Sequence, residues 1–463
     1  MKIAVLTRDF SPKAGGAEHY AMSLVEGLSS RHEVHVFAQT IEHHWPNVHY
    51  HRISKPFTRP RFVNQWWYAW QTWVATQSGF DIVHAHENTW HGEVQTVHVL
   101  PVWIHYFALK KSSAPWWVSL SRPSVRAAVS HCFKWLGVLL SPRLMSYLWL
   151  EHARLDVGPH HPHRHITSVS ASLTEQLLGH FPIGTERLHT LMPGVSGAFA
   201  WWQQEQRKEQ ERSCPTPEII AWSEVLRPRA VAGVGEHACT ESAFHADFLR
   251  SSDLSARARV SLGLLDLTKG SPLSHWLLWV GHDDQKKGLP ALLKALVLLP
   301  SSVGLMVVGR GALSASARAL AQSYGVASRV AWLGPLSEVA PAYWACDVLV
   351  HPTLEDTFGM VVLEAMSWAR PVVVSAPEFC GISSHLTHGQ EAWVLPNPED
   401  VAQLSQAIQA LLDPAVGAPM AERAWSWSQA HDWESVCLAQ EAVYRAVLES
   451  SQRAHPTGRA GHG

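Results

Sequence analysis

The chain has 463 residues, of which 46% are hydrophobic and 16% charged, and its formal net charge is −2. This composition excludes a disordered or fibrous protein, and the length is too great for one ordinary core. Six scattered cysteines without a C-x-x-C pair are typical of free thiols in a reducing cytoplasm, so neither a disulfide framework nor a zinc site is expected. We expect no nucleic-acid partner.

The first half of the chain alternates short apolar runs with amphipathic stretches, which predicts βαβ units around a parallel sheet. A helix is expected over 17–30, and the Pro193-Gly194 break favours a first domain that spans 1–195. The expected strands are 3–7, 33–38, 48–53, 81–84, 95–99, 166–170 and 188–192.

Residues 200–273 show no clear period, so this stretch is either an inserted subdomain or a partly disordered linker. The alternation then resumes and predicts a second doubly wound domain over 274–430, followed by a C-terminal helix and tail over 431–463. Its expected strands are 276–280, 304–308, 329–333, 348–351, 371–375 and 392–395. Its expected helices are 289–299, 313–324, 361–368 and 400–412.

No apolar run reaches the ~20 residues that a membrane-spanning helix needs, and the run at the N-terminus is too short for a signal peptide. Residues 101–165 carry eight Lys and Arg against two acids, interleaved with aromatic residues. This stretch is either a surface that docks on anionic lipid head groups or the solvated face of ordinary helices. The histidine-rich run 160–165 matches no zinc spacing, so we expect no metal site there.

Three strand-to-helix junctions carry residues suited to an anionic ligand. In the first, Gly15-Gly16 precedes a helix whose N-terminus offers free N–H groups, although such a pair by itself is more often a tight turn than a site. The second junction, 281–288, ends in Lys286 and Lys287, two cations placed to neutralise a diphosphate or simply to face solvent.

The third junction, 351–366, is the most informative. It contains two acids, Asp356 and Glu364, separated by seven residues, with a Phe-Gly-Met turn between them. Open α/β sheets bind ligands at the carboxyl ends of their strands, which is where this loop falls. A carboxylate early in the following helix is suited to the hydroxyl groups of a ribose.

These segments, in this order, resemble family 4 of the glycosyltransferases, the group 1 enzymes with the two-domain GT-B fold. The resemblance is carried by Gly-Gly-Ala-Glu at 15–18, Asp-Ile-Val-His-Ala-His at 81–86, Thr-Val-His at 96–98, Pro-Gly-Val at 193–195, Lys-Gly at 287–288, the acid-x7-acid segment and Ala-Arg-Pro-Val-Val at 369–373. It implies an α/β fold of two facing Rossmann-like, doubly wound parallel-sheet domains with a cleft between them. It leaves out 101–160 and 200–273.

The resemblance also implies roles on the phosphate side. Gly16 would face the donor diphosphate or the acceptor, and Lys287, helped by Lys286, would hold the diphosphate. His282 is a further candidate contact to the diphosphate, standing where many members of the family have arginine.

On the sugar side, Asp356 takes the place of the usual first glutamate. His98 matches the histidine that contacts the donor sugar and assists catalysis. Glu364 would bind the nucleotide ribose, and backbone amides near the sugar would come from Phe358, Gly359 and Met360.

Taken together, the family implies a retaining, metal-independent hexosyl transfer, with no cofactor besides a nucleotide-sugar co-substrate carrying UDP or GDP. The motifs are similar to those of bacterial enzymes of lipopolysaccharide or exopolysaccharide synthesis, so a glycan or lipid-linked acceptor is expected. The expected location is cytoplasmic, with peripheral contact to the inner membrane face. Two alternatives remain, a non-catalytic nucleotide-sugar sensor or partner subunit and a nucleotide-sugar epimerase.

Overall fold

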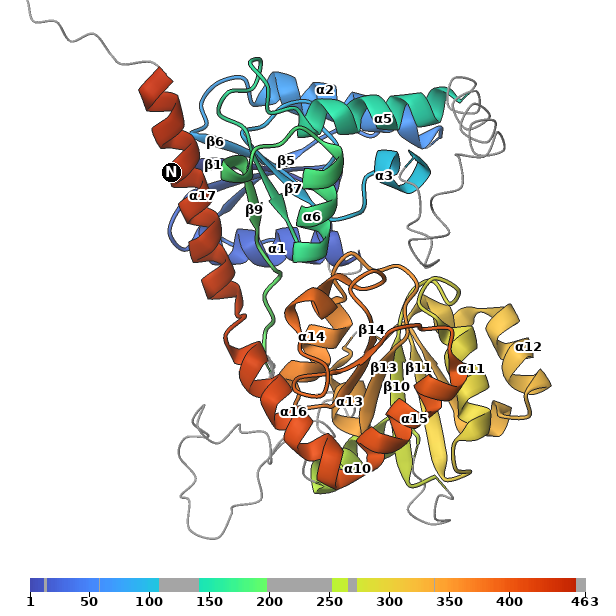
Figure 1. Ribbon diagram of the computed structural model, residues 1–463. Helices are drawn as coiled ribbons and strands as arrows, with labels where there is room; N and C mark the ends of the chain where they lie inside the picture. Colours follow the sequence, from blue (N-terminus) through green and yellow to red (C-terminus); the bar gives the residue numbers. More distant parts are fainter. Residues whose placement is uncertain are drawn as a thin grey trace, which may run out of the picture. The chain divides into compact units, whose positions relative to one another are not determined.

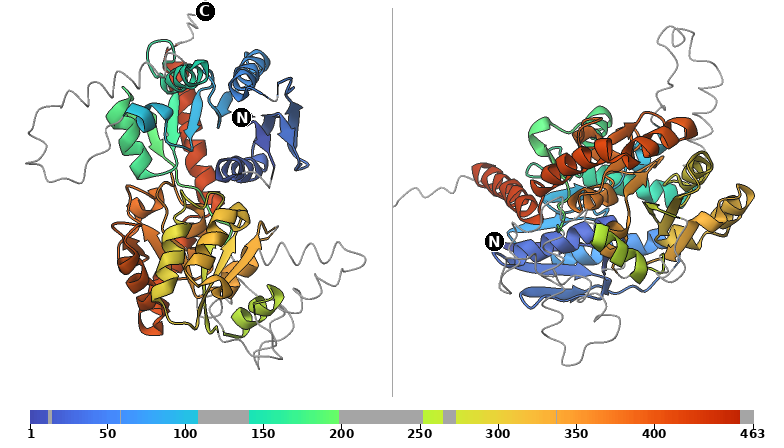
Figure 2. Two further views of the ribbon diagram at one scale, coloured as in Figure 1. Left: turned by 90° about the vertical axis from the view of Figure 1, so that its right-hand side faces the viewer. Right: turned by 90° about the horizontal axis from the view of Figure 1, so that it is seen from below.

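The computed structural model describes residues 1–11, 15–57, 59–107, 141–197, 252–264, 273–336 and 338–454 (Figure 1). The chain divides into two compact units. The first unit combines Met1–Pro193 with Trp433–Gly463, and the second unit is Gly194–Asp432. Each unit has its own parallel sheet with helices on both faces (Figure 2).

The first unit is built on seven parallel strands in the order β5-β3-β1-β6-β7-β8-β9. The order reverses between β1 and β6, so the carboxyl ends of these two strands mark the point where such sheets bind ligands. The strands are β1 (Lys2–Leu6), β3 (Glu33–Ala38), β5 (Val48–Arg52), β6 (Ile82–Ala85), β7 (Val94–Val97), β8 (His165–Ser168) and β9 (Leu188–Thr190). A separate short pair joins β2 (Asp9–Phe10) to β4 (Thr40–Ile41).

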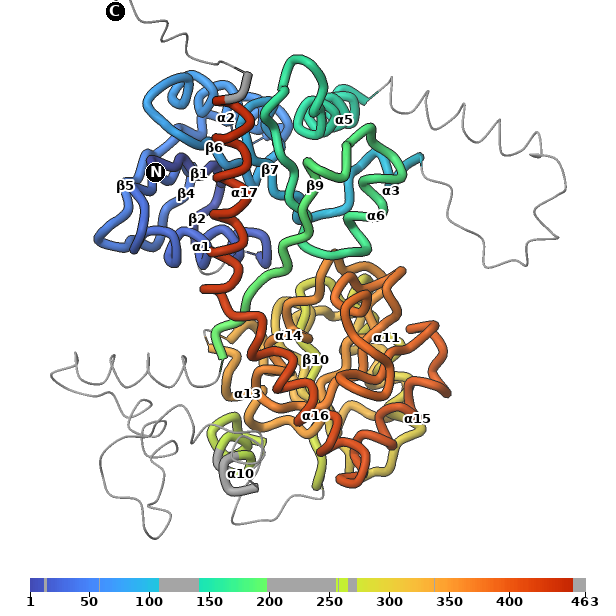
Figure 3. Tube along the Cα trace, turned by 60° about the vertical axis from the view of Figure 1, so that its left-hand side comes forward, coloured from blue at the N-terminus to red at the C-terminus, as the bar shows by residue number. Residues whose placement is uncertain are grey.

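The helices of the first unit begin where local capping allows. Ser141 caps α5 through the N–H of Leu144, with proline at the first helical position, and Ser170 caps α6 through the N–H of Leu173. The helices are α1 (Gly16–Ser29), α2 (Arg61–Ala75), α3 (Val102–Phe107), α5 (Pro142–Leu155), α6 (Ala171–His180) and α17 (Trp433–Ala454), with the 3₁₀ turn η2 (Thr185–Arg187). The last helix, α17, lies beside α1 (Figure 3).

The second unit has six parallel strands in the order β12-β11-β10-β13-β14-β15, and here the order reverses between β10 and β13. Its core is dominated by leucine and valine around the fully buried Trp279. The strands are β10 (His275–Val280), β11 (Val303–Val308), β12 (Val330–Gly334), β13 (Val348–His351), β14 (Val372–Ser375) and β15 (Trp393–Leu395). The helices are α10 (Ser252–Ser261), α11 (Leu289–Leu298), α12 (Ala315–Ser323), α13 (Ala340–Ala345), α14 (Met360–Ser367), α15 (Val401–Leu412) and α16 (Pro414–Gln429), with 3₁₀ turns η4 (Arg310–Leu313), η5 (Ala327–Arg329) and η6 (Gly381–His385).

The predicted fold class is confirmed, since both units are doubly wound parallel sheets. Of the uncertain stretch 200–273, the structure describes α10 and residues near it, and the rest lies outside the described residues. The same is true of 108–140 within the basic stretch 101–165. Among the helices that the structure describes, none is long and apolar enough to cross a membrane.

Candidate active site

Two loops of the second unit meet at its switch point. One follows β10 and runs through residues 281–288, and the other follows β13 and runs through 352–359. Because β10 and β13 are hydrogen-bonded neighbours in parallel, both loops leave the same edge of the sheet. The predicted lysines and the first predicted acid are therefore brought together.

The centre of this site is the carboxylate of Asp356. Its Oδ2 lies 2.6 Å from Lys287 Nζ and 3.0 Å from His351 Nε2, and Lys287 Nζ also donates to the carbonyl oxygen of Glu355 at 3.1 Å. Burial by itself would raise the pKa of Asp356, but the His351 hydrogen bond and the Lys287 charge outweigh it and hold that pKa well below its usual range. Burial lowers the pKa of His351, so a neutral imidazole donates to an ionised carboxylate.

The two loops are locked to each other through backbone contacts. Lys286 O accepts hydrogen bonds from Leu354 N at 2.8 Å and from Thr353 Oγ1 at 3.0 Å. Gly288 has a φ of +69°, and a Cβ at this position would lie 1.8 Å from Pro352 O. A glycine is required here by both the backbone conformation and the close approach of the second loop.

The N-terminus of α14 opens at the same edge. Gly359 precedes it with a φ of +99°, and no side chain caps the helix. Val362 N donates to Gly359 O at 2.9 Å, so the N–H groups of Met360 and Val361 are the ones that this turn can offer to an anion. The side chain of Phe358 is buried, and its N–H donates to Asp356 Oδ1 at 3.4 Å. Of the three predicted amides, those of Phe358, Gly359 and Met360, the one of Phe358 donates to the Asp356 carboxylate.

Further along α14, the half-buried Glu364 accepts a hydrogen bond from the hydroxyl of Tyr343, with 2.5 Å between Oη and Oε2. Burial raises the pKa of Tyr343 well above its usual value, and the neighbouring Glu364 adds to the shift. The phenol stays protonated and orients the carboxylate. Tyr343 comes from α13, which precedes β13 in the chain, whereas α14 follows β13, and this contact was not predicted from the sequence.

Positive charge also gathers around the first loop. The exposed Lys286 pairs with Glu355 at 2.9 Å rather than with Asp356. Burial and the charges of Arg310 and Lys287 together lower the pKa of the exposed His282. Arg310 itself is exposed and was not singled out from sequence, although its setting, between two glycines directly after β11, repeats the pattern of the other junctions.

The first unit carries the other two predicted residues. His98 follows β7 and lies half-buried, with its Nε2 2.9 Å from His86 Nδ1 and its ring stacked on that of His86. Tyr20 of α1 packs edge-on against His98, with ring centroids 5.0 Å apart. Burial lowers the pKa of His98 well below its usual value and that of His86 to about 3, so both rings are neutral.

Gly16 is exposed as the first residue of α1, with Gly15 as its N-cap, while residues 12–14 of the same junction lie outside the described residues. A second charged pair stands at this edge of the sheet, where Arg8 Nε lies 2.9 Å from Glu87 Oε2. The structure thus groups the predicted residues in two sets, with Gly16 and His98 in the first unit and the remainder in the second.

Two groups among the described residues bring three metal-type ligands together, and neither includes the run 160–165. One is His351, Asp356 and Cys380. Burial raises the pKa of the Cys380 thiol well above its usual value, and the ammonium of Lys287 already occupies Asp356 Oδ2. These features favour a hydrogen-bonded network over a bound cation.

Two family models match the chain. Residues 14–197 match the model "Glycosyltransferase Family 4" and residues 274–414 match "Glycosyl transferases group 1". Among curated proteins, the lipopolysaccharide glucosyltransferase WaaG of Escherichia coli is 30% identical over 165 residues, which is 35% of this chain and 43% of that protein. A D-inositol 3-phosphate glycosyltransferase of Mycobacterium marinum is 30% identical over 42% of this chain and 41% of its own length. The chain thus spans less than half the length of these curated relatives.

Solved structures agree over nearly the whole chain. A crystal structure of WaaG has a TM-score of 0.64 at 20% identity and covers 95% of this chain and 98% of its own. Sucrose-phosphate synthase from Thermosynechococcus elongatus also scores 0.64, at 18% identity, over 97% and 99% of the two chains. Anabaena HepE, solved in complex with UDP and glucose, scores 0.59 at 14% identity over 96% and 99%. At these identities the structural likeness shows the fold.

Proposed function

Because the chain belongs to the group 1 glycosyltransferases, we propose that it transfers a sugar from a nucleotide-sugar donor to a glycan or lipid-linked acceptor. The observation that carries this proposal is the Lys287–Asp356–His351 network at the switch point of the second unit, flanked by the uncapped N-terminus of α14. One cation, one fixed carboxylate and a set of helix-end amides suit a donor that carries a diphosphate and a sugar.

In the proposed mechanism, the oxygen of an acceptor hydroxyl bonds to the anomeric carbon while the bond between that carbon and the diphosphate oxygen breaks. The hydroxyl proton passes to the leaving diphosphate, on which negative charge grows as the bond breaks. Lys287 and the first amides of α14 stabilise this charge, which makes them effective in the transition state. Glu364, held by Tyr343, binds the ribose diol. The neutral imidazole of His98 is suited to a hydrogen bond with a sugar hydroxyl.

The finer features of the reaction are part of the proposal. We propose a hexosyl transfer with retention of anomeric configuration, without a metal ion, from a UDP- or GDP-sugar. Support for a UDP-sugar comes from HepE, whose solved structures carry UDP and UDP-glucose, and support for lipopolysaccharide synthesis comes from the likeness to WaaG. The proposed location is cytoplasmic, on the inner face of the membrane that holds a lipid-linked acceptor.

The first test is a thermal-shift screen of the full chain against UDP, GDP, ADP, CMP and dTDP, since a ligand that binds the folded state raises the melting temperature. We expect one nucleotide to raise it, and the rise to be lost in Glu364→Ala. The control is Lys294→Ala, which changes an exposed lysine on the neighbouring helix α11.

The second test measures transfer from the matching donor. We expect Lys287→Ala to lower kcat/KM by at least about a hundredfold, as for loss of one group that stabilises transition-state charge. Binding of the donor with no transfer to any lipid or glycan acceptor would favour the non-catalytic sensor. Conversion of the free donor into an isomeric donor would favour the epimerase.

A further inference from the structure

Helix α2 is amphipathic, but its polar side faces the interior of the unit and its apolar side faces outward. Its buried residues are largely polar, and each finds a partner, as when Asn64 and Gln39 exchange two hydrogen bonds, of 2.8 and 3.1 Å, and Gln65 donates to Asn88 O at 2.9 Å. Its outward side carries Trp70 and Trp73, 45% and 40% exposed. The polar residues of α2 face inward and its tryptophans face outward, so among the described residues no layer covers this apolar surface.

Neighbouring segments extend this surface, which we call the aromatic face. It consists of Phe57 before α2, Trp66, Trp67, Trp70 and Trp73 on α2, Trp90 after β6, and Trp149 on α5. The rings form two sets. In one, Trp66 is stacked on Trp149 at 4.7 Å and contacts Trp90 at 5.7 Å between centroids, and Trp73 contacts Trp90 at 6.5 Å. In the other, Trp67 contacts Phe57 at 6.4 Å and Trp70 at 5.5 Å. Trp149 is 51% exposed.

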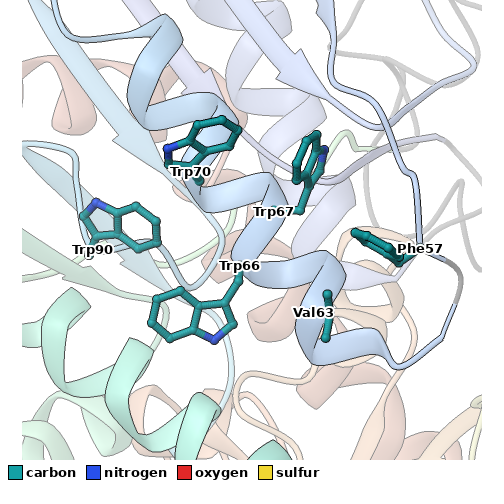
Figure 4. Close-up of a pocket in the computed structure, with 6 residues that line it drawn as sticks. All are labelled: Phe57, Val63, Trp66, Trp67, Trp70 and Trp90. Carbon is teal, nitrogen blue, oxygen red and sulfur yellow. The ribbon is translucent and has the colours of Figure 1, made fainter.

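Within the aromatic face lies an open hollow of about 430 Å³. Figure 4 shows three tryptophans projecting from α2 around it, with Phe57 and Trp90 supplied by flanking segments. Its lining is almost entirely carbon, because the indole N–H of Trp66 donates to Ser146 and that of Trp67 to Ser54. A hollow with so few free hydrogen-bonding groups suits hydrocarbon better than a sugar, whose hydroxyls need partners.

In the segments 54–75 and 141–155, which carry most of the aromatic face, the exposed charged side chains are all basic. Lys55, Arg59, Arg61 and Arg143 are all exposed beside it. Residues 54–75 contain no acid, and the single acid of 141–155, Glu151, is buried and accepts the backbone N–H groups of α3. Tryptophans with an apolar body and a polar edge, ringed by Lys and Arg, are the composition that prefers the interface of an anionic membrane.

We propose that the aromatic face docks on the surface of a bilayer containing anionic phospholipids, with hydrocarbon from the lipids entering the hollow. Trp149 and Arg143 belong to the basic stretch 101–165, whereas the other residues of this surface lie outside it. The surface adjoins the carboxyl edge of the first sheet, because Trp90 lies in the loop that follows β6. The same loop contains Glu87, which pairs with Arg8, and Asn88, which accepts from Gln65. Docking therefore brings that edge to the membrane. The use of this arrangement rests on the proposed lipid-linked acceptor, whereas the docking itself does not.

The test is flotation of the full chain with phosphatidylcholine vesicles, with and without phosphatidylglycerol, in the absence of donor and acceptor. We expect binding to the anionic vesicles at low salt. Replacing Trp70, Trp73 and Trp149 together by serine should weaken it at least about tenfold, because apolar burial at the interface is lost. Replacing Arg59 and Arg61 by glutamate should weaken it by at least about tenfold at low salt and by much less at high salt.

The matched control is Leu313→Ser, which removes an exposed hydrophobic side chain (64% exposed) from the second unit and should leave vesicle binding unchanged. All the substituted side chains are exposed, and an unchanged melting temperature shows that each variant is folded. The proposal is overturned if the parent chain stays unbound at low salt, or if the folded tryptophan variant binds as the parent does. It is also overturned if that variant changes the oligomeric state and not vesicle binding, because the face would then join two copies. Since no donor is present, these outcomes leave the transfer assay as an independent test of the proposed function.

Discussion

Asp356 keeps its negative charge in a buried place because two neighbours favour the ionised form. Removing one of them should show in the pH dependence of the reaction. In His351→Leu the hydrogen bond is lost and burial acts with less opposition, so the pKa of Asp356 rises. We expect the acid limb of the profile of kcat/KM against pH to move to higher pH by about one unit or more. An acid limb at the same pH as in the parent chain would show that His351 does not maintain this charge.

His86 contacts His98 as His351 contacts Asp356, through one hydrogen bond from a neighbouring side chain. We predict that it is a positioning residue, which holds the His98 ring and fixes its tautomer through the 2.9 Å contact between Nδ1 and Nε2. His86→Phe keeps an aromatic ring beside Tyr20 and loses the hydrogen bond. It should lower kcat about tenfold, the loss expected for one buried hydrogen bond, with little change in the KM of the donor.

His86→Asn is the informative companion, because its side-chain amide can place a hydrogen-bonding nitrogen where Nδ1 lies in histidine. It should restore most of the lost activity. Equal loss of activity in the phenylalanine and asparagine variants would argue for a packing role alone.

Among the elements, the two loops of the second unit depend on Gly288. In Gly288→Ala the new Cβ meets Pro352 O at 1.8 Å, and alanine is strained at a φ of +69°. We expect the variant to lose several kcal/mol of stability, on the order of 3 or more, or to bind no donor because the loops separate. Gly325→Ala is the control, since Gly325 has nearly the same φ, +70°, and open space around its Cβ. It should cost about 1 kcal/mol, measured by denaturant unfolding, and similar losses in the two variants would contradict this account.

How far sequence predicts these elements depends on which way their apolar residues face. The strands of both sheets were predicted within a few residues, because their runs are buried and end at junctions marked by glycine or proline. Helix α2 was not predicted, because its polar residues face inward and its tryptophans face outward. Helix α16 was also missed, and it carries Pro419 in its interior, where proline normally argues against a helix.

The candidate site divides along similar lines. Lys287, Asp356 and Glu364 were found because they occupy sequence motifs at strand ends. Tyr343, which holds Glu364, was not assigned a role, and neither was Arg310, which acts on the pKa of His282, because each reaches the site from another element of the second unit. Contacts of this kind depend on strand order, which a single sequence does not reveal.

At the scale of the molecule, five of the thirty histidines are buried among the described residues, namely His35, His84, His86, His165 and His351. Burial lowers the pKa of His84 well below its usual value, and lowers the pKa values of His86 and His91 to about 3. The unfolded chain protonates these residues near pH 6.5, whereas the folded chain holds them neutral, so the unfolded state binds more protons below that pH. Stability is therefore fully present above about pH 6.5 and falls as the pH approaches 3.

We predict a loss of roughly 1 kcal/mol per pH unit for each such histidine, observed as a falling melting temperature between pH 6.5 and 4. His86→Phe should reduce the slope. A melting temperature that stays level over this range would contradict the buried, neutral state of these rings.

Helix α17 connects the two ends of the chain within the first unit. Tyr444 Oη lies 2.7 Å from His84 Nδ1, and Arg31, just after α1, pairs with Glu441 at 2.7 Å. Gly27 leaves room for Cys437, whose sulfur would lie 2.4 Å from a Cβ there. These contacts join residues more than 350 positions apart. The first unit is thus discontinuous in sequence, with the whole second unit inserted before its last helix.

During synthesis on the ribosome, this discontinuity imposes an order of events. The sheet of the first unit emerges early, yet His84 has no Tyr444 to bind, and α1 keeps an open side, until about 240 further residues have been made. At roughly 5–20 residues per second that interval is on the order of 10–50 s. During this time the nascent first unit lacks the helix that packs on α1, and a chain that stops before Trp433 never completes it.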